Sequence, residues 1–235
     1  MQKRTKIITV SIVAGAIVLG ATAAIAGPIF YRDVIVGEAE AAPSVTAAPT
    51  ATSGTDAEAA ASDLSGSWNV ATGSYAGYRL DEVLNGTDVT VVGRTEEVAG
   101  SLTVEGDTLT AGEITVDMAS IATDSGNRDA YFRDTALRTS EFPTATFTLT
   151  APVTATAAPV AGEVQTVTAT GDLTIAGVTR SVSVELEAVL NGADGQVAGS
   201  IPITFADFGV EAPNLGFVSV EPDGFIEFSL VLAPA

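Results

Sequence analysis

The sequence predicts an all-β fold, an antiparallel sandwich or barrel of about eight strands, and three features support that prediction. Apolar and polar residues alternate with a period of two through most of the second half of the chain, as expected for a sheet with one buried and one solvated face. Turn sequences such as Asn85-Gly86 and Asn191-Gly192 separate the alternating runs. The main interruption is a charged stretch at 125–138 with helical signals.

The alternation gives each predicted strand one apolar face. In the last run, apolar Ile226, Phe228 and Leu230 alternate with other residues, two of them polar. Strands of roughly eight to eleven residues favour a barrel over a sandwich, and about eight strands close a lumen that can hold one small ligand. The predicted strands are 67–75, 87–93, 98–105, 108–118, 145–155, 164–175, 180–190, 195–205 and 225–233.

One short helix is predicted between two of these strands. Asn127 is suited to cap a helix that runs from Arg128 to Ala136. Within it Asp129 precedes Arg133 by four residues, the spacing of a stabilising ion pair on a helix surface. A structural role in such pairs is one interpretation of the arginines here; the other is that Arg128 holds the charged headgroup of a ligand.

The N-terminus contains an uncharged apolar run of 25 residues, 7–31, that follows three cations. About 20 apolar residues span the hydrocarbon core of a bilayer, so residues 1–32 are predicted to form a transmembrane signal anchor. The positive-inside rule then puts the rest of the chain outside the cytoplasm, as a single-pass protein of the cell membrane. The alternative is a cleaved signal peptide ending at the Ala24-Ile25-Ala26 pattern, which would secrete the protein.

A linker is predicted between this run and the globular domain. Residues 33–65 are rich in Ala, Thr, Pro and acids and have no periodic apolar face. Such a segment cannot bury enough apolar surface to order itself, so we expect it to be disordered. The β-barrel domain is expected to occupy residues 66–235, a length that suffices for one hydrophobic core.

The composition argues against several classes of function. The chain contains neither Cys nor His, which removes the usual ligands of zinc, copper and haem and the commonest general base. From residue 33 onward 29 acidic residues stand against six Arg, a balance that repels nucleic acid. No nucleophile-elbow, zinc-protease or phosphate-loop pattern is present, so no catalytic residue, metal site or cofactor is predicted.

Three blocks of sequence carry a family resemblance. They are SIATDSGNRDAYFRDTALRTSEFPTATF at 120–147, GDLTIAGVTRSV at 171–182 and ADFGV at 206–210. In this order and spacing they resemble the YceI-like family of lipid- and polyisoprenoid-binding proteins. The resemblance covers most of 68–233 and implies an extended, lipocalin-like antiparallel β-barrel with an apolar internal tunnel. The chain departs from the family pattern at 68–79, where many members carry His and this sequence has none.

This resemblance implies a non-catalytic carrier that holds a polyisoprenoid, a quinone-type lipid or a fatty-acyl lipid in its tunnel. Its expected partners are that lipid and, through the N-terminal helix, the membrane; a homodimer is one alternative for its oligomeric state. Alternative functions are a cell-surface β-sandwich spacer or adhesion module with a filled core and, less favoured, a hydrolase that uses paired acids. Inward positions of the strands and nearby aromatics are the candidates for the tunnel wall. The predicted ligand-binding residues are Phe132, Phe142, Phe147, Leu149, Leu173, Ile175, Val184, Leu186, Ile201, Ile203, Phe205, Phe208 and Arg128.

Overall fold

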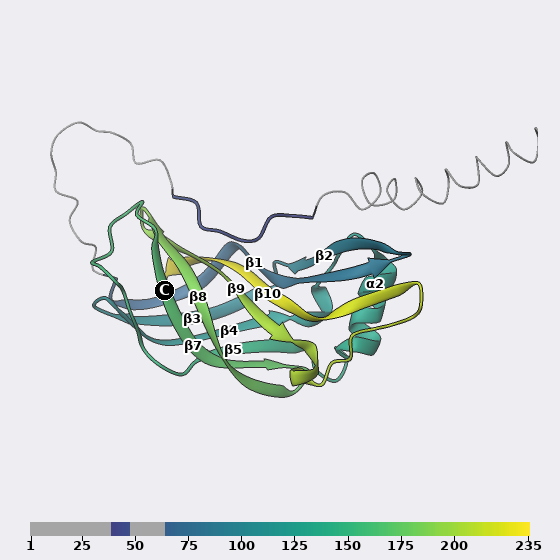
Figure 1. The fold of residues 1–235 in the computed structure, drawn as a ribbon. Helices are drawn as coiled ribbons and strands as arrows, with labels where there is room; N and C mark the ends of the chain where they lie inside the picture. Colours follow the sequence, from purple (N-terminus) through teal and green to yellow (C-terminus); the bar gives the residue numbers. More distant parts are fainter. Residues whose placement is uncertain (1–38, 48–63) are drawn as a thin grey trace, which may run out of the picture.

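The computed structural model describes residues 39–47 and 64–235 (Figure 1). Within the second range the chain folds into an antiparallel β-barrel with one short α-helix, which confirms the predicted fold class for this part of the chain. The predicted transmembrane helix at 1–32 lies outside the described residues. Among the helices of the described ranges, none is long and apolar enough to cross a membrane.

Eight strands close the barrel in the order β10-β9-β8-β7-β5-β4-β3-β1, and β1 pairs with β10 to complete the ring. Closure gives the first and last strands a partner and so protects two edges that would otherwise be exposed. β2 extends the sheet beside the second half of β1, and β6 pairs with β4. The strands are β1 (Gly66–Leu84), β2 (Thr87–Thr95), β3 (Val98–Glu105), β4 (Thr108–Asp117), β5 (Thr144–Leu149), β6 (Val153–Thr154), β7 (Gln165–Ile175), β8 (Val178–Asn191), β9 (Asp194–Thr204) and β10 (Val218–Pro234).

β1 continues well beyond its predicted end at residue 75 and has 19 residues. A bulge between Ala71 and Tyr75, where Gly73 adopts a φ of 95°, shifts the phase of the alternation and conceals the continuation of the strand. The strand ends at the two-residue turn Asn85-Gly86, whose φ angles are both positive, as the turn prediction required. The second half of β1 lies between β2 and β10, and this pairing also starts β10 earlier than predicted.

The helical segment differs from the prediction in its details. α2 (Gly126–Tyr131) begins after Ser125, so Asn127 lies inside the helix rather than at its N-cap. The Asp129 carboxylate accepts hydrogen bonds from the Thr123 N–H (2.9 Å) and hydroxyl (2.7 Å) and ties the helix to the preceding loop, which replaces the predicted pairing with Arg133. The other helical turns are η2 (Met118–Ser120), the π-helical η3 (Phe132–Ala136) and η4 (Phe205–Phe208).

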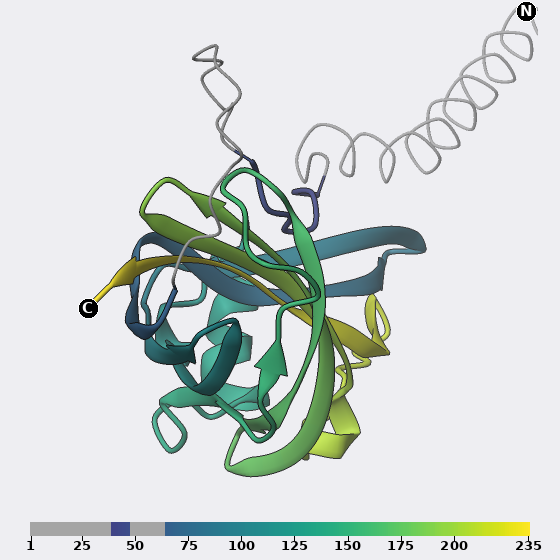
Figure 2. The same cartoon turned by 90° about the vertical axis from the view of Figure 1, so that its left-hand side faces the viewer.

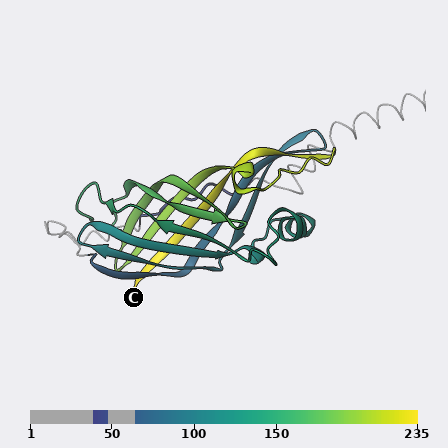
Figure 3. The ribbon, with the colours of Figure 1, turned by 90° about the horizontal axis from the view of Figure 1, so that it is seen from below.

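Two features of the arrangement position the site. The helical segment, the β1–β2 hairpin and the loop before β10 gather at one end of the barrel (Figures 1 and 3). Of the predicted linker, the structure describes residues 39–47, which run outside the barrel wall (Figure 2).

Candidate ligand-binding cavity

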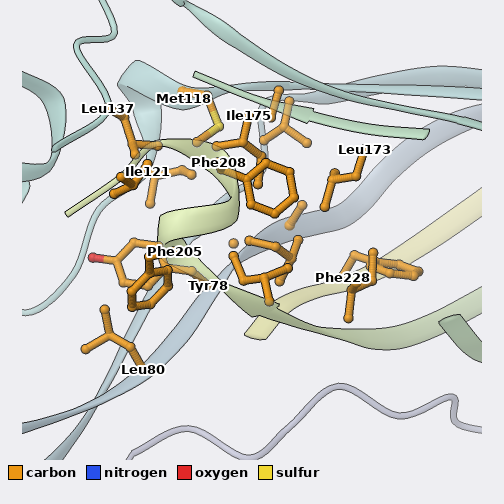
Figure 4. A pocket seen from close by; sticks show the side chains of 18 of the residues that line it. Tyr78, Leu80, Met118, Ile121, Leu137, Leu173, Ile175, Phe205, Phe208 and Phe228 are labelled. Carbon is orange, nitrogen blue, oxygen red and sulfur yellow. The ribbon is translucent and has the colours of Figure 1, made fainter. Parts of the chain in front are cut away.

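Inward-facing side chains enclose a cavity of ≈ 560 Å³ inside the barrel. All eight strands of the closed ring contribute to its predominantly apolar wall, as the period-two alternation requires. The volume falls within the range of about 300–1,000 Å³ that is typical of ligand pockets. In Figure 4 Phe205 lies beside Tyr78 and Leu80 on one side, while Met118 and Ile121 line the other.

The structure places most of the predicted ligand-binding residues on this wall. Alternation in the strands turns eight of them inward, as the sequence indicated, whereas Arg128, Phe132, Phe205 and Phe208 reach the wall from helical turns. Contact of these residues with a ligand stays a prediction. The twelve that line the cavity are Phe132, Phe147, Leu149, Leu173, Ile175, Val184, Leu186, Ile201, Ile203, Phe205, Phe208 and Arg128.

Phe142 is the one predicted residue that the structure does not place on the cavity wall. It precedes the start of β5 at Thr144 and lies in the turn that leads into the strand. Its ring packs against Gly177 and lies 5.1 Å from the Arg138 guanidinium. An aromatic residue next to a strand does not share the strand's inward orientation, and this one closes the turn between the helical segment and the barrel.

Several wall residues escaped the sequence prediction. Tyr78, Leu80 and Glu82 alternate along the second half of β1 and all line the cavity. Their period-two spacing is typical of a strand, but the bulge between Ala71 and Tyr75 puts it out of phase with the alternation before the bulge. Tyr78 stacks on Phe132 of η3, with ring centroids 5.1 Å apart and an interplanar angle of 14°, so this part of β1 holds the helical segment against the wall.

A charged cluster lies at the end of the cavity that carries α2. The Arg128 guanidinium donates to Glu82 (3.0 Å) and to Asp124 (2.5 Å). Glu82 is only 5% exposed, so Arg128 compensates a carboxylate that has lost most of its contact with water. One arginine thus faces two carboxylates, and the cluster leaves no excess positive charge at the cavity wall.

The ionisation of two wall residues follows from this setting. Burial alone would lower the pKa of Arg128, but Glu82 and Asp124 raise it overall, and the guanidinium stays charged. Burial raises the pKa of the Tyr78 phenol well above its ordinary value of 10.0, and the neighbouring carboxylates add to this rise while Arg128 opposes it. Tyr78 is therefore a neutral wall residue at physiological pH.

The mouth of the cavity has an apolar rim on the loop before β10. Leu215 and Phe217 line the cavity and are nevertheless 55% and 59% exposed. The Asn85 N–H donates to the Phe217 carbonyl (2.7 Å), which fixes this loop to the β1–β2 hairpin. The lumen therefore continues into an exposed apolar surface at this end of the barrel.

Together these features define a class of protein: a small closed β-barrel with an internal apolar cavity, a wall of buried aliphatic and aromatic side chains, and a rim open at one end. In the described ranges no group of three or more Asp, Glu, His or Cys side chains is placed to hold a metal ion.

Comparison with known proteins identifies the family within that class. The YceI-like domain matches residues 68–232, and the chain belongs to the YceI-like family. A polyisoprenoid-binding domain from Saccharophagus degradans, implicated in plant cell wall breakdown, shares the fold with 20% identity and a TM-score of 0.59, over 72% of this chain and 98% of that one. BcnA from Burkholderia cenocepacia does so with 21% identity and a TM-score of 0.54, over 69% and 98%. No curated protein matches the chain.

Proposed function

We propose that the protein binds a long apolar lipid, such as a polyisoprenoid or fatty-acyl chain, inside the barrel and leaves it chemically unchanged. The apolar cavity of ≈ 560 Å³ carries this proposal. Each methylene that moves from water to such a wall contributes about 0.8 kcal/mol, so a long chain binds by burial with few polar contacts. Membership of the YceI-like family, and the polyisoprenoid-binding domain among the similar structures, support this ligand class.

The charged cluster supports a ligand whose head is uncharged. Arg128 already donates to Glu82 and Asp124, so a phosphate or carboxylate placed there would have to compete with two carboxylates and would meet their repulsion. An uncharged hydroxyl, amide or quinone carbonyl need not displace these carboxylates from Arg128 and is not repelled by them. We therefore assign Arg128 to holding the cavity wall in shape, which is one of the two interpretations that the sequence left open, rather than to binding a charged headgroup.

We also propose that the barrel works outside the cytoplasm, attached through the apolar run at 7–31. The three cations before that run and the excess of acids after it support this orientation. Protease treatment tests it, with cells in which the protease reaches an intact cytoplasmic membrane compared with fully lysed cells: the barrel should be cleaved or released before that membrane is broken. Protection of the barrel until lysis would place it in the cytoplasm.

Lipid analysis of the purified full-length protein tests the proposed ligand. Solvent extraction and mass spectrometry should recover a lipid in nearly stoichiometric amount, and the delipidated protein should take up a fluorescent prenyl or fatty probe. Failure of both would favour a spacer module without ligand. Competition of that probe with a polyprenol and with a polyprenyl phosphate of equal length tests the charge of the headgroup. The neutral lipid should compete better. Equal competition would refute the uncharged headgroup but not the binding of an apolar lipid.

A further inference from the structure

The outer wall of the barrel contains a patch of residues that point outward and are nevertheless buried. Glu227, Ser229 and Ala198 point away from the lumen, since their strand neighbours Phe228 and Leu230 line the cavity and Ser229 pairs with Ala198 across β10 and β9. Their exposed fractions are nevertheless 2%, 4% and 1%. Outward-facing side chains of a barrel in water are normally exposed, so other groups cover this patch. Neighbouring strands supply part of the cover, since Arg79 pairs with Glu227 (2.6 Å) and the Gln196 amide donates to the Ser229 hydroxyl (3.2 Å).

One end of the cover is an ionic contact made by Glu40, which precedes the barrel in the chain. Its carboxylate pairs with Arg94 of β2, and its carbonyl accepts from Arg79 of β1 (2.5 Å). Both arginines also approach Glu227, at 2.6 Å from Arg79 and 3.7 Å from Arg94. The Arg94 guanidinium lies over the Tyr75 ring, 4.6 Å from its centroid. The two arginines therefore bridge a buried carboxylate of the wall and an acid of the preceding segment.

The other end of the cover reaches the far side of β10. The Val45 N–H donates to the Glu187 carboxylate of β8, and the Thr46 N–H donates to the Gln196 side chain of β9, both at 3.2 Å. The Asn191 amide donates to the Thr46 carbonyl (3.0 Å). In the sheet register Arg79 pairs with Phe225 of β10 and Gln196 pairs with Val231, so a segment bonded to both side chains crosses β10 over the stretch that contains Glu227 and Ser229. Figures 1 and 2 show this segment outside the barrel wall.

We propose that this outer face is a docking site for an extended peptide that carries an acidic residue at one end, and that its occupant is the segment Ala39–Ala47 of the same chain. Charge complementarity selects it: Glu40 is the acid that meets the two arginines. The segment also turns one side to the barrel, with Pro43 and Val45 partly buried and Ala42 and Ser44 exposed, as an added strand-like peptide would.

The docked segment, which we name the strap, replaces a free tether with a fixed attachment beside the seam where β1 and β10 close the barrel. Its Glu40 end lies nearer the mouth, because Arg94 also forms a backbone bridge to Ala122, just before the helical segment. The strap therefore fixes Ala39, its first residue, on the side of the barrel that carries the cavity mouth.

Distance measurements between spin labels on the full-length protein test the strap, and a chain without Cys allows single labels to be placed at will. We would label Ala42→Cys on the exposed side of the strap and Thr148→Cys on the outward side of β5. A docked strap gives one narrow distance distribution. The strap variant Glu40→Lys/Val45→Pro, which removes a contact at each end and leaves the barrel untouched, should broaden it several-fold, as should Arg79→Ala/Arg94→Ala.

The matched control is Arg180→Ala, and it should keep the narrow distribution. Arg180 is an exposed arginine of β8 that donates to the Thr179 carbonyl (3.1 Å). A broad distribution in the parent protein, or a narrow one that survives Glu40→Lys/Val45→Pro, would overturn the proposal. Mixing chains labelled only at 42 with chains labelled only at 148 tests the remaining occupant: a dipolar signal between them would show that the strap docks on a second copy instead of its own barrel.

Discussion

The lumen and the charged cluster beside it bury side chains by opposite means. The lumen wall is built from apolar residues whose stabilisation grows with buried area and requires no particular partner. In the cluster, the buried Glu82 and the partly buried Arg128 each compensate the charge of the other. The loss of stability should therefore grow gradually with the apolar area removed from the wall, whereas removal of a single charge from the cluster should cause a large loss at once. The difference assigns ligand affinity to the lumen and the shape of the mouth end to the cluster.

Removal of one charge from the cluster should have the largest effect on stability. Arg128→Ala leaves Glu82 buried without its guanidinium, and breaking a buried pair in this way costs about 3–5 kcal/mol. Chemical denaturation, with the midpoint and slope compared between variants, measures the loss.

A double variant distinguishes pairing from a loss of packing. Glu82→Leu/Arg128→Met removes both charges and should recover most of the stability lost in Arg128→Ala. Arg180→Ala, at an exposed position, should stay within about 0.5 kcal/mol of the parent. If Arg128→Ala also costs less than about 1 kcal/mol, the cluster is an ordinary surface network that contributes little to the stability of the barrel.

Filling the lumen should reduce ligand affinity with little effect on the fold. A side chain added at Gly112 of β4 points into the cavity, and its Cβ would lie at ordinary contact distances of 3.7 Å from Leu102 and 3.8 Å from Leu149. In Gly112→Leu about three ligand methylenes lose their place, which at about 0.8 kcal/mol each corresponds to a roughly 50-fold weaker Kd. Titration of the delipidated protein with a fluorescent prenyl probe measures it.

The neighbouring residue supplies the control for this variant. Ala111 is exposed on the opposite face of the same strand, so Ala111→Leu adds the same side chain outside the barrel and should leave the Kd unchanged. Equal loss in both variants would mean that the substitutions disturb β4 and that the lumen is not where the probe binds.

The rim should affect the rate of uptake more than the affinity. Leu215→Ser/Phe217→Ser removes the exposed apolar surface that connects solvent to the cavity, and transfer of a probe from neutral lipid vesicles should slow several-fold. Phe225→Ser is the control, because Phe225 is 43% exposed but does not line the cavity. Stopped-flow fluorescence measures the transfer, and equal slowing by both variants would remove the rim from the uptake route.

What the sequence could predict depended on whether the signal was local. The alternation through Val184 and Leu186 placed both on the cavity wall, because side-chain direction in a regular strand follows from spacing alone. The bulge at Gly73 interrupted that rule and hid Tyr78 and its neighbours. The arginine was harder still: the local i,i+4 rule pointed to pairs within the helix, whereas Arg128 also pairs with Glu82, 46 residues away in the chain.

The smallest expected effect concerns Tyr78, where lumen and cluster meet. Its phenol has a raised pKa in the fold and an ordinary value near 10.0 in the unfolded chain, so above about pH 10 the unfolded chain gives up a proton that the barrel retains. Stability should be unaffected below that pH and fall as the pH rises further. Tyr78→Phe cannot ionise, so its Tm should fall less between pH 9.5 and about 11 than that of the parent. Tyr131→Phe controls for the loss of a phenol from the cavity wall, and an identical alkaline slope for the parent and Tyr78→Phe would show that this phenol is hydrated rather than buried in the wall.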